Sequence, residues 1–176
     1  MLAVPIARLV AGSAFSPVIV PGDRSVVYIS LEGGAQSPWI VPIEGGAPSQ
    51  LTKTFANPNG HDVTPDGKQL LFGTLAARGP ALMICELAAC VPQPLASVAP
   101  VGFPEWVLDG KAVAGVLAED QAINLWIQPI DGKPRYQVTH FADDLHIWSA
   151  AWSGKRFALV RGRVKNDIVL FRGLGK

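Results

Sequence analysis

The sequence has few charged residues and no long hydrophobic run. Charged residues make up 16% of the 176 positions, and 15 basic against 14 acidic side chains leave a net charge of +1. Without a basic excess there is no electrostatic case for binding nucleic acid. Hydrophobic residues make up 49% of the chain, which argues against disorder. Because the apolar runs are only as long as strands, we expect no direct insertion into a membrane.

Motifs of nucleophilic and phosphate chemistry are also missing. The sequence contains no Gly-x-Ser-x-Gly elbow, so it lacks the hydrolase domain of a prolyl oligopeptidase-like enzyme. Gly33-Gly34 and Gly45-Gly46 adjoin apolar runs as hairpin turns, with no helix to receive a phosphate. We therefore expect no cofactor and no metal.

What the sequence does have is a four-fold internal repeat. A short turn with a basic residue recurs along the chain, and these basic residues lie 44, 43 and 44 positions apart. A fixed period of this size with strand-like segments indicates a propeller or a solenoid. The four basic residues are Arg24, Lys68, Lys111 and Lys155.

Each repeat contains up to four strand-like segments. An apolar or aromatic segment precedes the turn, and two apolar runs follow it. In three repeats a turn such as Asp131-Gly132 leads to a fourth, more polar segment that contains proline. Proline cannot donate to a strand ladder, so this segment belongs at the outer edge. We therefore predict an all-β fold, a β-propeller with four blades of four antiparallel strands.

The repeat also predicts where the blades begin and end. One domain over residues 1–176 would contain blades at 13–56, 57–99, 100–144 and 145–176, with an additional N-terminal strand at 3–10. That strand matches the outer-strand segments, and the last repeat stops after its third strand at 168–171. The N-terminal strand could therefore complete the last blade and close a small ring. Alternatively, the chain is part of a larger propeller. A signal peptide over residues 1–15 is disfavoured because Pro5 and Arg8 interrupt its apolar core.

Three segments resemble a known family. Residues 63–72, VTPDGKQLLF, resemble the repeat of TolB-like, WD-like bacterial propellers, and residues 125–133, LWIQPIDGK, look like their third strand and outer hairpin. Residues 166–171, NDIVLF, are similar to their last strand. The resemblance covers nearly the whole chain and favours a C-terminal propeller portion of a longer protein. It implies the fold more strongly than the function, since such propellers occur in transport accessories, peptidases and sensor kinases.

The only two cysteines flank a predicted hairpin turn. Cys85 ends a third strand and Cys90 begins the next, and residues that face each other across a hairpin can come close enough for a disulfide. A disulfide would place the domain in an oxidising compartment such as a bacterial periplasm, which the TolB-like resemblance also implies. The alternative, two small apolar residues, stays open.

Most other residues with chemical potential have a structural interpretation. His61 and Asp62 precede a hairpin, and we expect a local hydrogen bond that orders the turn. Trp106 and Trp152 share one position of the repeat, which predicts packing between blades. Trp39 and Trp126 share another position and are expected in the core. A loop group that matches no recognised metal-ligand pattern consists of His140, Asp143, Asp144 and His146.

Three classes of function fit these observations. The first is a non-catalytic propeller that binds a protein or peptide, alone or as part of a larger protein. The second is a sensor or regulatory propeller whose catalytic domain, such as a protein kinase or a peptidase, is missing from this chain. The third is a propeller enzyme with a metal in its central channel. We find no His, Asp, Glu or Asn that recurs at one position of the repeat, so we favour the first class and expect no enzyme.

Loops at the blade faces are the expected contact region of a binding module. Candidate loops lie at residues 75–80, 118–122, 141–146 and 161–165, and the last two carry charges of opposite sign. The candidate partner-contact residues are Asp143, Asp144, Arg161, Arg163 and Lys165.

Overall fold

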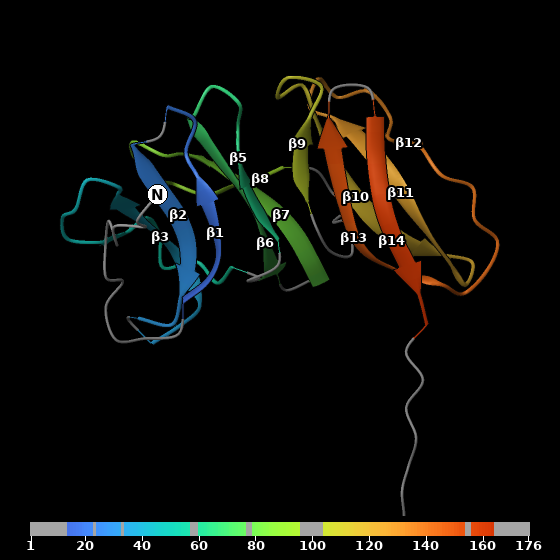
Figure 1. Ribbon diagram of the computed structural model, residues 1–176, viewed down its shortest axis with the longest axis horizontal. Coiled ribbons are helices and arrows are strands. Elements are labelled where there is room, and N and C mark those ends of the chain that lie inside the picture. The colour runs from blue at the N-terminus through green and yellow to red at the C-terminus, as the bar shows by residue number, and fades with distance from the viewer. Residues whose placement is uncertain are drawn as a thin grey trace, which may run out of the picture.

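The structure, a computed structural model, describes residues 14–22, 24–32, 34–56, 60–76, 79–95, 104–153 and 156–163. These residues form antiparallel sheets joined by turns and loops, with no helix among them (Figure 1). Three sheets have four strands, ordered as they follow in the chain, and the fourth has two described strands. The all-β fold and the four-stranded blades are thus confirmed for three repeats.

The strands of each sheet occupy matching positions of the repeat. The first sheet contains β1 (Ala14–Ile19), β2 (Ser25–Ser30), β3 (Ser37–Pro42) and β4 (Ser49–Gln50). The second contains β5 (His61–Val63), β6 (Gln69–Ala76), β7 (Gly79–Glu86) and β8 (Gln93–Pro94). The third contains β9 (Glu105–Val107), β10 (Ala112–Glu119), β11 (Ala122–Pro129) and β12 (Tyr136–Gln137). The last contains β13 (His146–Ser153) and β14 (Arg156–Gly162).

Side chains of the turn motif close the hairpin between β5 and β6. The Thr64 hydroxyl donates to Asp66 Oδ1 at 2.7 Å and accepts from the Gln69 N–H at 2.9 Å. Gly67 has a φ of +72° and donates its N–H to the Thr64 carbonyl at 2.8 Å. A Cβ there would lie 3.2 Å from the Pro21 carbonyl oxygen of the first sheet. Glycine at this position therefore allows both the left-handed backbone conformation and the close approach of the two sheets.

The second strand of each four-stranded sheet carries much of the core. In β6, Leu70, Leu71 and Phe72 are all fully buried, although successive side chains of a strand point to opposite faces. Val27 and Ile29 of β2 are equally buried. A strand buried on both faces reads as a continuous apolar run, which is why the sequence identified these strands.

Tryptophans connect neighbouring sheets. Trp106 on β9 packs with Leu71 and Leu82 of the second sheet. Trp152 on β13 packs against the cluster of the third sheet that contains Val107. The predicted role of this repeat position in packing between blades is confirmed.

The core position predicted for Trp39 and Trp126 is wrong, because both side chains are only half-buried. They do share a position of the repeat, since Trp39 pairs with Gln50 and Trp126 with Gln137. The strand that should cover them, β4 or β12, is only two residues long. A short polar outer strand leaves the neighbouring side chain partly open to solvent.

Cys85 and Cys90 are joined by a disulfide, with Cα atoms 4.9 Å apart. The bond spans the turn from β7 toward β8. Cys85 is buried in the core cluster of the first and second sheets, and Cys90 packs against that cluster. Of the two alternatives left open by the sequence, the structure contains the covalent one.

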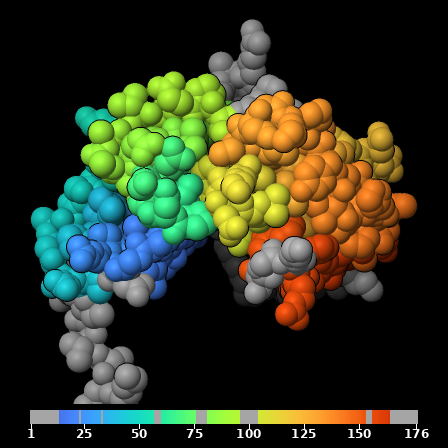
Figure 2. All heavy atoms as spheres, turned by 90° about the horizontal axis from the view of Figure 1, so that it is seen from above, coloured from blue at the N-terminus to red at the C-terminus, as the bar shows by residue number. Residues whose placement is uncertain are grey.

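The sheets follow one another around an arc (Figure 2). The strands at its two ends, β1 and β14, expose apolar side chains, including Phe15, Ile19, Phe157 and Val160. The middle sheets have no comparable exposure on β5 and β9. The N-terminal strand at 3–10 and the third strand at 168–171 lie outside the described residues, so ring closure stays a prediction.

Candidate functional site

Several candidate loops lie at one end of the sheets because of the direction in which the strands run. Strands alternate in direction within each sheet, so the hairpin after the second strand lies at the same end as the connection to the next sheet. This end, which we call the loop face, carries residues 119–122, 138–145 and the end of β14. The described parts of the candidate loops named from the sequence therefore belong to one face.

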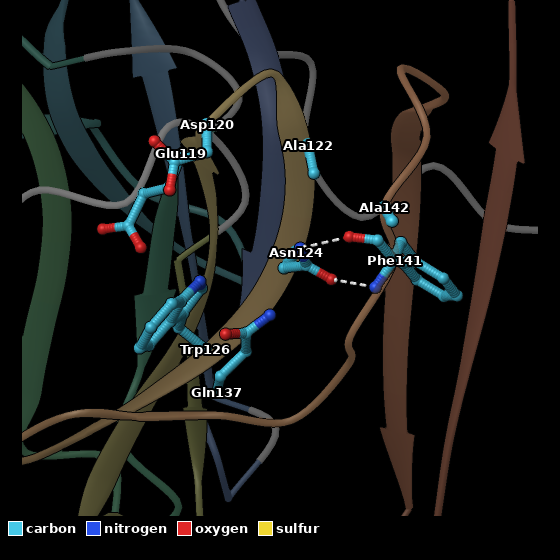
Figure 3. Close-up of a pocket in the computed structure, with 8 residues that line it drawn as sticks. All are labelled: Glu119, Asp120, Ala122, Asn124, Trp126, Gln137, Phe141 and Ala142. Atoms are coloured by element: carbon cyan, nitrogen blue, oxygen red, sulfur yellow. Dashed lines mark hydrogen bonds between the residues drawn. The ribbon is translucent and has the colours of Figure 1, made fainter.

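A pocket of about 310 Å³ opens on the loop face (Figure 3). The β10–β11 hairpin, strands β11 and β12, and the connection to β13 form its walls. Asp120 and Gln121 have φ values of 50° and 68°, which allow the two-residue turn that ends the hairpin beside it. The residues that line the pocket are Glu119, Asp120, Ala122, Asn124, Trp126, Gln137, Phe141 and Ala142.

Asn124 holds the loop that forms one wall. Its amide donates to the Phe141 carbonyl at 3.1 Å, and its oxygen accepts from the Phe141 N–H at 2.8 Å. The Thr139 hydroxyl donates to the same oxygen at 2.9 Å. Asn124 and Thr139 are both buried, so this network fixes Phe141 at the pocket.

Two aromatic rings at the pocket each carry an arginine. The Arg135 guanidinium carbon lies 4.8 Å from the Trp126 ring centroid, and Arg135 also pairs with Glu119. The Arg161 guanidinium carbon lies 3.3 Å from the Phe141 ring centroid. Cation–π contacts of this kind hold a guanidinium in a fixed orientation. The aromatic walls are therefore rigid and carry oriented N–H groups.

Three of these N–H groups have no acceptor. Trp126 Nε1, Arg135 Nη1 and Arg161 Nε are buried and make no hydrogen bond, and they are three of the six such side-chain atoms among the residues that the structure describes. Buried donors without partners are rare and each calls for an explanation. Of the three residues only Trp126 lines the pocket, and all three atoms are closed off from solvent.

The first sheet contains the same framework with its donors satisfied. Trp39 is equivalent to Trp126, and there the Ser37 hydroxyl accepts from Trp39 Nε1 at 3.2 Å and from Gln50 Nε2 at 2.8 Å. Asn124 stands where Ser37 stands in the first sheet, two residues before the tryptophan. Its oxygen already accepts two other hydrogen bonds, which leaves Trp126 Nε1 without its usual acceptor.

The predicted contact residues pair with one another. Asp143 pairs with Arg161, and Asp144 pairs with Arg163. The hydrogen bond from Arg163 lowers the pKa of Asp144. The two loops of opposite charge are thus joined beside the pocket rather than separate, while Lys165 lies outside the described residues.

Asp62 has a different role from the one predicted. Its Oδ1 accepts from the next N–H, of Val63, at 2.8 Å, but its Oδ2 accepts from the Trp106 N–H of the third sheet at 2.7 Å. Asp62 therefore links two blades rather than ordering the hairpin turn. His61 beside it is buried, and neither ring nitrogen has a hydrogen-bond partner. Burial lowers the pKa of His61 to about 4.

Glu105 was not among the candidate residues predicted from the sequence. Asp62 pairs with Leu71 and Glu105 with Ala114, so the two carboxylates occupy the same position of neighbouring inner strands. The statement that no acidic residue recurs at one position of the repeat is therefore wrong. Counting six residues back from Lys68 and Lys111 would have found the pair. Burial, and then the charge of Asp62, raises the pKa of Glu105 to about 7.

Among the described residues, no group of three or more His, Cys, Asp or Glu side chains is placed to hold a metal ion. The part of the chain that the structure describes contains no helix long and apolar enough to cross a membrane.

Comparison with known proteins shows the fold. No family model and no curated protein matches the sequence. The structure is similar to TolB from Acinetobacter baumannii, with a TM-score of 0.73 and 17% identity over 84% of this chain and 37% of that one. A putative TolB from Agrobacterium tumefaciens matches with a TM-score of 0.70 and 19% identity, over 82% and 52%. An acylaminoacyl peptidase from Pyrococcus horikoshii matches with a TM-score of 0.57 and 15% identity, over 86% and 28%.

The chain therefore has a TolB-like β-propeller fold. It spans between about a third and a half of the length of the two TolB structures that it matches, at 37% and 52%. At these identities the likeness concerns the fold and not the activity.

Proposed function

We propose that the protein is a non-catalytic propeller module that binds a protein or peptide at the loop face, with the pocket between β10, β11 and β12 as the contact site. The observation that carries this proposal is the pocket on the loop face, where the aromatic residues Trp126 and Phe141 lie beside the polar side chains of Asn124 and Gln137. Oriented polar groups beside aromatic walls are typical of binding pockets.

The propeller neighbours support this proposal only in part. The similar structures include TolB, from the family that the sequence resembles, but also an acylaminoacyl peptidase, which is an enzyme. A sensor or regulatory propeller attached to a catalytic domain is accordingly the second candidate. This chain covers 28% of that peptidase.

The Cys85–Cys90 disulfide supports a location outside the bacterial cytoplasm. Disulfides persist in oxidising compartments such as the periplasm and are rare in the reducing cytosol. The TolB-like resemblance agrees with this location.

A blocking substitution tests the contact site. Ala142 is exposed and lines the pocket, so Ala142→Trp should fill the pocket without removing a packed side chain. The matched control is Ala47→Trp, an exposed position in the turn before β4, at the opposite end of the strands. Peptides selected from a displayed random library against the wild type should bind the Ala47→Trp variant and lose binding to Ala142→Trp.

Two results would contradict the proposal. If the selected peptides bind Ala142→Trp as well as they bind the control, the contact site lies elsewhere. If the isolated chain turns over a small ester, sugar or phosphate substrate, and a metal chelator abolishes that turnover, the protein is an enzyme.

A further inference from the structure

The first strands of the second and third sheets are joined by one carboxylate. Strands β5 and β9 each pair along one edge only, with β6 and β10, so backbone N–H groups on the other edge have no strand partner. Asp62 of β5 supplies an acceptor for β9, because its Oδ2 accepts from the Trp106 N–H at 2.7 Å. The two sheets are thus linked at the open edge of β9.

A second carboxyl group adjoins this link. Asp62 accepts from the peptide N–H that directly follows Glu105, so the charge of Asp62 lies beside Glu105. The N–H groups of Trp106 and Val63 both donate to Asp62 and favour its charged form. Glu105 is half-buried, and its side chain has no hydrogen bond or ion pair among the described residues. Of the two carboxyl groups, Glu105 is therefore the one that holds a proton.

The described strands around the pair bring no further charge close to it. Strands β1 and β6 have no ionisable side chain, while β7 and β10 have only Glu86 and Glu119, each at its last residue. The only one on β13 is His146, at its first residue. His61 precedes Asp62, but successive side chains of a strand point to opposite faces. Burial lowers the pKa of His61 to about 4, so its ring is neutral near pH 7.

We propose that the junction of the second and third sheets is sensitive to pH, because ionisation of Glu105 weakens the link from Asp62 to Trp106. When the Glu105 proton passes to solvent, a second negative charge forms beside the first in a partly buried place. Repulsion and burial then both favour an opening that brings the two carboxylates into water. The pKa of Glu105, raised to about 7 by burial and then by the charge of Asp62, sets this change near neutral pH.

Hydrogen exchange of the Trp106 N–H measures the opening. In nitrogen-15-labelled protein, the protection factor of this amide corrects for the intrinsic effect of pH on exchange. If Glu105 regains its ordinary pKa of 4.5 when the junction opens, protection should fall about ten-fold between pH 6 and pH 8. Protection should also be lower than for the slowest-exchanging amides of the protein, because the junction opens without global unfolding.

Three variants test the roles of the two carboxyl groups. Glu105→Gln should keep the protection of Trp106 constant between pH 6 and pH 8, because glutamine does not ionise. The matched control is Glu44→Gln, an exposed glutamate in the turn between β3 and β4, which should keep the ten-fold fall. Asp62→Asn removes the fixed charge, so the fall should move to lower pH, since that charge contributes to the raised pKa of Glu105.

Three results would overturn the proposal. They are wild-type protection of Trp106 that does not change between pH 6 and pH 8, the same fall in Glu105→Gln as in the wild type, and protection equal to that of the slowest amides. The last result would mean that Trp106 exchanges only when the whole protein unfolds. None of these results depends on whether a peptide binds at the loop face.

Discussion

Replacement of Asp62 by alanine tests whether the second and third sheets depend on one carboxylate. Asp62 Oδ2 accepts from the Trp106 N–H at 2.7 Å, and Oδ1 accepts from the Val63 N–H at 2.8 Å. Hydrogen bonds to a charged group contribute about 1.5–3 kcal/mol each. Burial opposes them, since it raises the pKa of Asp62. We therefore expect Asp62→Ala to lower the free energy of unfolding by about 3 kcal/mol, less than the sum of two full bonds.

Urea denaturation followed by tryptophan fluorescence measures this effect. With a slope of about 2–3 kcal/mol per molar urea, a loss of this size lowers the midpoint by about 1 M. Asp62→Asn should lie between the wild type and Asp62→Ala, because its single carbonyl oxygen can keep one of the two bonds. The slope itself should fall if the sheets on either side of the junction begin to unfold separately.

The matched control is Asp66→Ala, in the exposed turn between β5 and β6. Asp66 also accepts two hydrogen bonds, from the Thr64 hydroxyl and the Lys68 N–H, but both stay within one hairpin. Its loss should therefore lower the midpoint less than Asp62→Ala. Equal midpoints for the two variants would refute the idea that Asp62 joins neighbouring blades.

Two further predictions concern titration and the disulfide. The pKa of Glu105 rises from 4.5 to about 7 in the folded protein, so its stabilising contribution is present below pH 4.5 and is lost as the pH rises to about 7. The pKa of His61 falls from 6.5 to about 4, so its contribution is present above pH 6.5 and is lost as the pH falls to about 4. Glu105→Gln should therefore make stability fall more steeply than in the wild type between pH 6.5 and 4, and unchanged pH profiles in urea denaturation would contradict this. Thiol titration of the unfolded, non-reduced protein should find neither Cys85 nor Cys90 free. Reduction of the disulfide should lower the free energy of unfolding by about 2 kcal/mol, a small effect because the closed loop is short. Two free thiols would contradict both the disulfide and the argument for an oxidising compartment.

The features of the fold that the sequence predicted are local ones. Leu70, Leu71 and Phe72 identify a strand buried on both faces without reference to any distant residue. The turn around Gly67 follows from residues three to five positions apart. The repeat then supplied the order of the strands, because each unit uses the same turn to enter its second strand.

The candidate site could not be predicted in the same way, because its contacts join segments far apart in the sequence. Asn124 reaches Phe141 across 17 positions, and Arg161 reaches Asp143 across 18. The sequence identified both charged loops and the opposite sign of their charges, but not that the two loops pair. Their pairing depends on how β13 and β14 align, including the irregular register between Ile147 and Ser149.

The first and third sheets differ beside an equivalent tryptophan of the repeat, and the candidate pocket lies in the third. Trp39 and Trp126 occupy the same position in the third strand of their sheets, and each pairs with a glutamine of the outer strand. The difference lies two residues earlier, where Ser37 accepts the indole N–H and Asn124 does not. Serine and asparagine are both able to accept this bond, so neither composition nor the repeat distinguishes them. Asn124 does not accept from the indole because its oxygen already accepts from the Thr139 hydroxyl and the Phe141 N–H. The loop that contains these two residues has its own sequence in each blade. The surroundings of Trp126 therefore differ from those of Trp39 through one residue of the strand, asparagine in place of serine, together with a loop that donates to the oxygen of that asparagine.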